Sequence, residues 1–284
     1  MGKFKKIVIV LIVIALIAGI VLVTANIVLS KVDNKANPVV TMDIEGYGKI
    51  KIELYPDMAP NTVKNFIRLA ERGFYKGKKF SEIGEGLVSG GADSVAEDSE
   101  ETAGPKLSNI KDLAEGETDK AYSIEGEFIE NGYNDNTLSH QRGVISMSRK
   151  SYNDYQQEIA MVQMMGYKDY INTLLEEMYD SQSSGFFILT EDNTSYDGTY
   201  AAFGKVKEGM DIIDNISKLE VKTGEDGNKT TEIVNAPVIS DVSVETNGVN
   251  YGEPEVKDVF DFDSIFNFFM QQYMQSQSST TTTE

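Results

Sequence analysis

The sequence predicts a mainly β domain supplemented by a few helices. Across residues 40–54, apolar and polar side chains alternate on both sides of Gly46-Tyr47-Gly48, which indicates a hairpin of two half-buried strands. Asn61 or Thr62 can then cap a helix that ends at Gly73. Apolar runs typical of strands lie at 143–147, 186–189, 201–206 and 238–244, and a second helix is predicted at 210–219.

An uncharged apolar run occupies residues 7–29. About 20 such residues span a bilayer core, whereas the apolar centre of a secretory signal has only ~7–15. Because lysines precede the run, we predict a single-pass membrane anchor with residues 1–6 in the cytoplasm and the remaining chain outside. A cleaved signal peptide is the alternative, but residues 24–26 make a poor cleavage site, so we favour an uncleaved anchor. A buried core helix is a third hypothesis.

The composition excludes several classes of function. The net charge of −19 argues against a nucleic-acid partner, because phosphates bind basic surfaces. An acidic surface keeps a domain soluble or attracts basic clients, and we favour the first interpretation. The chain has no cysteine and a single histidine, His140, which we interpret as a structural residue at a strand end. No calcium-loop or phosphate-loop pattern is present, so we predict neither a metal nor a cofactor.

The segments that flank the domain differ from it in composition. Residues 30–38 are polar and predict a short tether, and residues 247–257 are rich in Gly, Asn, Pro and charge, as in a linker. Residues 258–274 have the spacing of an amphipathic helix, which can dock on its own domain, bind a partner or touch a membrane. We favour docking. Residues 275–284 are of low complexity and predict a disordered tail.

Three blocks of sequence point to a known family. Residues 52–80 read IELYPDMAPNTVKNFIRLAERGFYKGKKF, and GVISMS follows at 143–148. GFFILT and DGTYAAFGKVKEGMDIID lie within residues 185–214. Together these blocks resemble the cyclophilin family of peptidyl-prolyl cis-trans isomerases, and several motifs in the right order are more specific than one. The resemblance implies a cyclophilin-like domain over residues 39–246: a closed antiparallel β-barrel, capped by two helices, with a proline-peptide groove on one face.

Residues 150–183 depart from the family pattern. The resemblance implies that only a short loop should connect the strand at 143–147 with the strand at 186–189. Residues 155–179 have helical spacing and are rich in methionine, so the sequence predicts a helical insertion beside the groove. We favour helices packed on the barrel, with methionine filling gaps. The alternative is a lid or arm whose flexible apolar side chains bind varied unfolded clients.

The groove of a prolyl isomerase needs little bond chemistry. The barrier of ~20 kcal/mol reflects the partial double bond of the amide, so a catalyst must favour the twisted amide. An apolar pocket for the proline ring and a hydrogen-bond donor near the amide are sufficient. The resemblance implies that this donor is an arginine in an F-H-R segment. Here Phe80 matches the phenylalanine, Ser81 stands at the histidine and Glu82 stands at the arginine.

Other groove positions are also carried over from the resemblance. Phe187 stands at the pocket floor, whereas we favour barrel core for Phe186. Gly90 stands at a glutamine and Ser195 at a tryptophan of the family. The predicted substrate-binding residues are Leu87, Val88, Gly90, Met147, Ser148, Phe186, Phe187, Tyr196 and Tyr200.

The exchange of arginine for Glu82 leaves two functions open. A carboxylate cannot donate to the prolyl nitrogen, and losing a charged donor costs ~1.5–3 kcal/mol, to which the repulsive charge adds. This predicts a loss of roughly a hundredfold or more in rate if nothing compensates. Arg149 is a candidate substitute, although we favour a solvated surface arginine. The first function is a prolyl isomerase that assists the folding of exported, proline-containing polypeptides. The alternative is a non-catalytic chaperone or interaction module that binds proline peptides. A purely structural role would follow if the insertion closed the groove.

Overall fold

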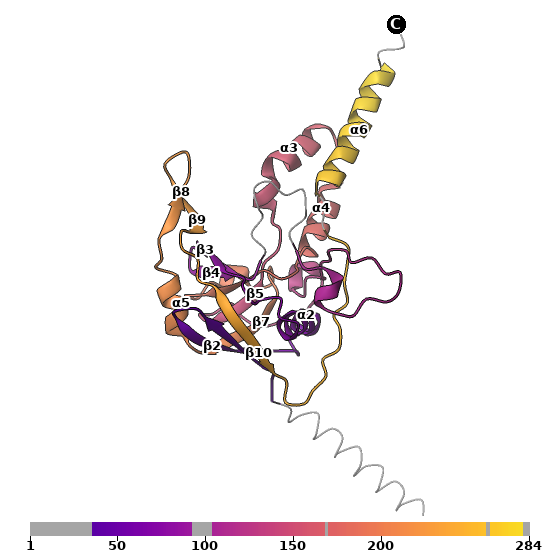
Figure 1. The fold of residues 1–284 in the computed structure, drawn as a ribbon. Coiled ribbons are helices and arrows are strands. Elements are labelled where there is room, and N and C mark those ends of the chain that lie inside the picture. The colour runs from indigo at the N-terminus through magenta and orange to yellow at the C-terminus, as the bar shows by residue number, and fades with distance from the viewer. Residues whose placement is uncertain (1–35, 93–103, 168–169, 260–261, 281–284) are drawn as a thin grey trace, which may run out of the picture. The chain divides into compact units, whose positions relative to one another are not determined.

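The computed structural model describes residues 36–92, 104–167, 170–259 and 262–280 of the 284-residue chain. The described residues from Pro38 onward form one compact unit (Figure 1). The predicted anchor at 7–29, the segment 1–6 and most of the predicted tether lie outside the described residues. Among the helices that the structure describes, none combines the length and the apolar character that a bilayer span needs.

Ten strands form a single antiparallel sheet. Along the sheet the strands follow the order β10-β1-β2-β7-β5-β6-β4-β3-β9-β8. Their bounds are β1 Val39–Ile44, β2 Gly48–Leu54, β3 Phe80–Gly84, β4 Leu87–Gly90, β5 Val144–Met147, β6 Phe186–Leu189, β7 Ala202–Glu208, β8 Val221–Thr223, β9 Lys229–Ile233 and β10 Ile239–Glu245. The strands nearest the site, β5, β6 and β4, therefore lie together although the helical insertion separates β5 from β6 in the chain.

The sheet is not closed, so the prediction of a closed barrel is wrong. Strands β10 and β8 are its two ends. The outer edge of β3 is occupied by β9 through the pairing of Glu82 with Glu232, and β10 therefore has no ladder with β3. The chain meets here only around the first residues of the two strands. The contacts are an isolated bridge between Lys79 and Val238 and backbone bonds such as those from the Phe80 N–H to Pro237 O (2.9 Å) and from the Ile239 N–H to Lys78 O (2.8 Å).

Helix α2 (Pro60–Glu71) begins at a proline. An N–H at this first position would have no partner within the helix, so a residue without an N–H costs nothing there. The predicted caps are wrong, because the cap comes from a distant loop. The Glu127 carboxylate accepts bonds from the backbone N–H groups of Asn61 (2.9 Å) and Thr62 (2.7 Å) and from the Thr62 hydroxyl (2.7 Å). A tertiary contact, rather than a local side chain, fixes the start of this helix.

The main core lies between the sheet and the apolar faces of α2 and α5 (Met210–Ile216). Phe66 of α2 is at its centre, with its ring centroid 4.9 Å from Tyr75, 5.0 Å from Phe203 and 5.8 Å from Phe186. All four rings are fully buried. This aromatic cluster packs α2 against the inner face of β6 and β7.

A second, smaller core joins the insertion to the C-terminal helix. Helices α3 (Gln156–Met164), α4 (Tyr170–Tyr179) and α6 (Phe262–Thr280) lie together (Figure 1). Their shared buried residues are Ile159, Val162, Leu174, Met178 and Phe269. The C-terminal helix thus packs on the insertion. It continues to Thr280, so the part of the predicted disordered tail at 275–280 is helical.

The segment predicted as a linker, residues 247–257, is an ordered strap along α2. Asn61 and Glu255 exchange two bonds, from Asn61 Nδ2 to Glu255 O (2.9 Å) and from the Glu255 N–H to Asn61 Oδ1 (2.8 Å). Arg68 Nε also donates to Gly252 O at 2.9 Å. The strap delivers the chain from β10 to α6. Four short 3-10 turns complete the described fold: η1 Leu107–Asn109, η2 Ile129–Asn131, η3 Tyr152–Tyr155 and η4 Thr194–Tyr196.

Removal of the cap on α2 should destabilise the domain. We expect Glu127→Ala to lower the free energy of unfolding by about 1–2 kcal/mol, because the first turn loses its acceptor. Urea unfolding of the purified chain measures the effect. Glu125→Ala is the matched control, since Glu125 is a nearby exposed glutamate, and an equal loss in both variants would contradict the capping role.

Candidate peptide-binding site

A pocket of about 170 Å³ opens on the outer face of strands β4 and β6. We call it the groove pocket. Its lining residues are Leu87, Ser89, Ser148, Arg149, Phe187, Tyr196 and Tyr200. They come from β4, the residues after β5, β6, η4 and the loop before β7. Residues from five parts of the chain are therefore gathered by the pairing order of the sheet.

Aromatic rings form the base of the groove pocket. Phe187 is 4 % exposed and lies edge-on to Tyr196 at 5.7 Å and to Tyr200 at 5.3 Å between ring centroids. Tyr196 and Tyr200 also touch each other, at 5.2 Å. These perpendicular contacts are the favoured geometry for aromatic pairs. The result is a rigid apolar surface of a size that suits a small ring.

The alternation along β4 and β6 separates pocket residues from core residues. Phe187 faces the pocket, whereas its neighbour Phe186 is fully buried in the main core. On β4, Leu87 and Ser89 line the pocket, while Val88 is fully buried in the core. Because successive side chains of a strand point to opposite faces, this division follows directly from the strand period.

Several predicted site residues lie away from the groove pocket. Val88, Met147 and Phe186 belong to the main core, so their predicted substrate contact is not supported by their position. Gly90 is also buried, and a Cβ there would lie 2.8 Å from Lys79 O. Ser89 lines the pocket but was not among the predicted substrate-binding residues, whereas its neighbour Gly90 was. Side chains of a strand alternate between its two faces, so counting every second residue from Leu87 would have selected Ser89.

Glu82 lies on β3, opposite Ser89 of β4 and Glu232 of β9. Its side chain is exposed and is not part of the pocket lining. The strand is irregular between Phe80 and Glu82, where the register with β4 shifts. Glu82 therefore places a carboxylate beside the pocket and provides no donor.

Arg149 is held at the rim of the pocket and is half-buried, which contradicts the interpretation as a solvated surface arginine. Its Nε donates to Thr199 O (3.0 Å) and its Nη1 to Lys150 O (2.9 Å). Its Cζ lies 4.7 Å from the ring centroid of Tyr200, 4.9 Å from that of Tyr179 and 5.2 Å from that of Phe128. Contacts of a cation with aromatic faces contribute ~0.5–2 kcal/mol, so this cage fixes the guanidinium in place. Its Nη2 makes no hydrogen bond to a described residue.

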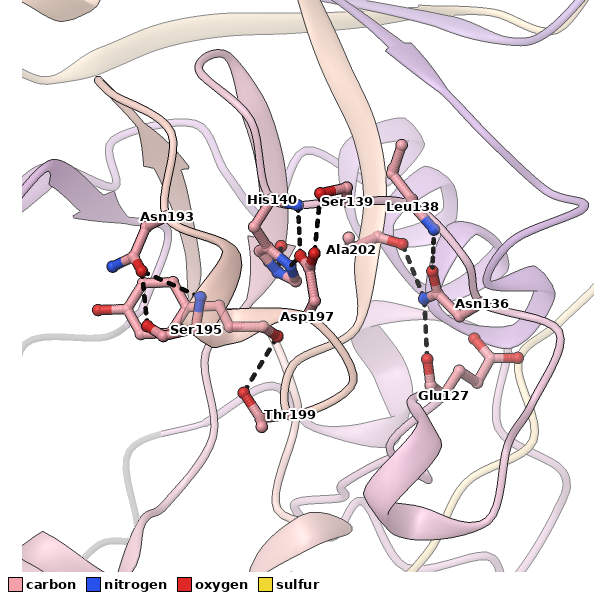
Figure 2. Close-up of polar contacts among 12 residues, drawn as sticks. Glu127, Asn136, Leu138, Ser139, His140, Asn193, Ser195, Asp197, Thr199 and Ala202 are labelled. Atoms are coloured by element: carbon pink, nitrogen blue, oxygen red, sulfur yellow. Dashed lines mark hydrogen bonds and ion pairs between the residues drawn. The ribbon is translucent and has the colours of Figure 1, made fainter.

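Behind the pocket floor, the buried His140 and Ser146 are joined by hydrogen bonds to Asp197 at the surface. Asp197 accepts bonds from the His140 backbone N–H (2.6 Å), from the Ser139 hydroxyl (2.8 Å) and from His140 Nδ1 (3.0 Å), as Figure 2 shows. The other ring nitrogen, Nε2, is 2.9 Å from the Ser146 hydroxyl. With Nδ1–H donating to the carboxylate, Nε2 accepts from Ser146. The imidazole is nearly parallel to the Phe187 ring, at 6.4 Å between centroids.

Burial lowers the pKa of His140, although the hydrogen bond and the charge of Asp197 act in the opposite direction. Desolvation acts to raise the pKa of Asp197, but the donors from His140 and Ser139 outweigh it and the pKa is lowered. The pair is thus a neutral imidazole beside a carboxylate at neutral pH. His140 braces the floor of the pocket, beyond the structural strand-end role predicted for it. Across the described parts of the chain, no three histidine, aspartate or glutamate side chains gather so as to hold a metal.

Comparison with known proteins identifies the family. The family model described as cyclophilin type peptidyl-prolyl cis-trans isomerase/CLD matches residues 39–164 and 170–239. The chain belongs to this family. Peptidyl-prolyl cis-trans isomerase B of Bacillus subtilis is 29% identical over 178 residues, which cover 63% of this cyclophilin and 90% of the relative. A peptidyl-prolyl cis-trans isomerase of Acinetobacter baylyi is 29% identical over 194 residues, covering 66% and 76%.

A solved structure shows the same fold. A cyclophilin type peptidyl-prolyl cis-trans isomerase of Cryptosporidium parvum aligns with a TM-score of 0.50 at 19% identity, over 74% of this chain and 99% of that chain. Nearly the whole of that cyclophilin is thus matched by part of the present one. At this identity the likeness concerns the fold alone.

Titration of His140 should appear in the stability of the protein. Below its ordinary pKa of about 6.5 the unfolded chain binds a proton at histidine, while the folded chain resists it. The free energy of unfolding should therefore fall as the pH drops from 7 to 5.5, by at most about 1.4 kcal/mol per pH unit. Urea unfolding across this range tests it. His140 is the only histidine, so His140→Gln should give a flatter profile. An unchanged slope in that variant would overturn the assignment.

Proposed function

We propose that this chain is a prolyl isomerase that binds proline in the groove pocket and uses Arg149 as its hydrogen-bond donor. One observation carries the proposal: a buried aromatic floor and a fixed guanidinium share one pocket. Membership of the cyclophilin family and the names of its relatives support isomerase activity.

The geometry suggests how rotation is assisted. A proline ring on Phe187 is held by the apolar floor, while the chain on the other side of the amide turns. As the amide twists, conjugation is lost and the nitrogen gains a lone pair that accepts a hydrogen bond. The unused Nη2 of Arg149 is the donor. A charged hydrogen bond of ~1.5–3 kcal/mol accounts for roughly ten- to hundredfold in rate if it forms only in the twisted state.

Glu82 limits this activity. Its carboxylate lies on the strand that pairs with Ser89 of the pocket lining, whereas the next carboxylate, Glu232 of β9, is in an ion pair with Lys222. Glu82 therefore places one negative charge beside the bound amide, where it repels the carbonyl oxygen and contributes no donor. We therefore expect slow turnover together with retained binding of proline peptides.

The proposed clients are unfolded, proline-containing exported polypeptides. The uncharged run at residues 7–29, with lysines before it, supports an anchor that holds the domain outside the membrane. A tethered domain meets newly exported chains before they fold. The acidic surface also disfavours adhesion of the domain to anionic lipid.

A second candidate function is a non-catalytic chaperone on the same scaffold. The position of Glu82 favours it, because the pocket can bind a proline ring without any donor there. The two functions share the pocket and differ only in turnover.

Substitution of Arg149 tests the donor. We expect Arg149→Ala to lower kcat/KM for a short X-Pro peptide by about ten- to hundredfold, mostly in kcat, because the donor acts on the twisted amide. Lys150→Ala removes an adjacent exposed cation and is the matched control. Equal activity of the Arg149→Ala variant and the wild type would exclude Arg149 as the donor.

Substitution of Glu82 separates the two functions. We expect the wild type to be active and Glu82→Arg to raise kcat/KM by about tenfold, because a repulsive charge becomes a donor. Glu232→Arg, which makes the same change of charge on the neighbouring strand, should have a much smaller effect. A wild type without activity and an active Glu82→Arg variant would instead establish the binding module.

A further inference from the structure

A second pocket adjoins the groove pocket and is formed largely by the helical insertion. It has a volume of about 240 Å³ and is lined by Glu130, Arg149, Tyr152, Leu175, Met178 and Tyr179, among others. We propose that this insertion pocket is a subsite for an apolar side chain of a residue near the proline of the bound peptide. This inference rests on the proposed proline-peptide function and adds a sequence preference to it.

Arg149 is shared by the two pockets. It belongs to the lining of both. One of its ring contacts, Tyr200, belongs to the groove pocket, and another, Tyr179, belongs to the insertion pocket. A peptide with proline over Phe187 that continues past the guanidinium therefore reaches the second pocket. The unused Nη2 lies where the backbone of such a peptide passes.

The charges in the insertion pocket are already engaged. Arg149 donates to two backbone carbonyls, and Glu130 accepts a bond of 3.3 Å from the Tyr179 hydroxyl. The remaining lining consists of the aliphatic and aromatic side chains of Leu175, Met178 and Tyr152, together with the small polar Ser151. A basic side chain would meet the charge of Arg149, and an acidic one would meet Glu130. An apolar side chain such as leucine leaves no charge unpaired and loses water on binding.

The wall of this pocket is braced from behind. Met178 lines the pocket and is also part of the second core, where Leu174 of α4 and Phe269 of α6 are buried. The C-terminal helix thus supports the helix that carries the pocket. This packing gives the insertion a preformed wall, which lowers the ordering cost of binding.

The experiment uses the full chain and a set of peptides. Each peptide contains one proline within alanines, and leucine, lysine or glutamate replaces one alanine at each position from three before to two after the proline. Kd is measured by calorimetry, and isomerisation is measured separately. We expect one position where leucine binds about fivefold more tightly than alanine, from burial of its side chain.

Two variants locate the effect. Tyr152→Ala and Leu175→Ala should reduce the leucine preference towards unity and leave the Kd of the all-alanine peptide unchanged. Met161→Ala is the control, because Met161 is 43% exposed, close to the 42% of Tyr152, and lies outside the pocket. It should keep the full preference.

The outcomes distinguish the subsite from the proposed function. Isomerisation of the alanine peptide without a leucine preference, or with a preference that both variants retain, overturns the subsite alone. A preference for lysine or glutamate also overturns it. If leucine lowers Kd but no peptide is isomerised, the subsite is supported and the proposed isomerase activity is excluded. Absence of binding by every peptide overturns both.

Discussion

The site depends on the alternation of side chains along β6. Phe186 points inward to Phe66 and Phe80, and Phe187 points outward to Tyr196 and Tyr200. A shift of one residue would exchange the two faces, placing the floor of the pocket in the core. Pairing with β4 on one side and β5 on the other fixes this register. The stability of the domain and the shape of its pocket are thus set by the same strand.

Around this floor, the fold holds polar groups in two layers. On the rim, Arg149 is enclosed by three rings and bonded to two carbonyls. Beneath the floor, His140 links Asp197 to Ser146. Both layers are preorganised, so little rearrangement is needed when a peptide arrives. The helical insertion adds a third contribution, because Tyr179 joins the cage of Arg149 and connects it to α4.

The negative charge of Glu82 works against the proposed isomerase activity. The strand beside β4 carries the exposed Glu82, whose neighbour Glu232 is in an ion pair with Lys222, whereas Arg149 lines the pocket itself. In the proposed function, a bound amide lies between one carboxylate and one guanidinium. Only the guanidinium assists rotation there, because the carboxylate cannot donate. The same proposal therefore expects retained binding of proline peptides together with slow turnover.

From the sequence alone, the strand and helix periods, the family and the pocket residues Phe187, Tyr196 and Tyr200 were predictable, because these depend on local spacing and ordered motifs. The open sheet was not, since it depends on whether β9 or β10 occupies the edge of β3. Nor were the cap supplied by Glu127, the docking of α6 on the insertion, or the cage around Arg149. Each joins residues distant in the chain, whose contact has no local signature. The sequence determined which groups were present, and tertiary packing decided which of them meet.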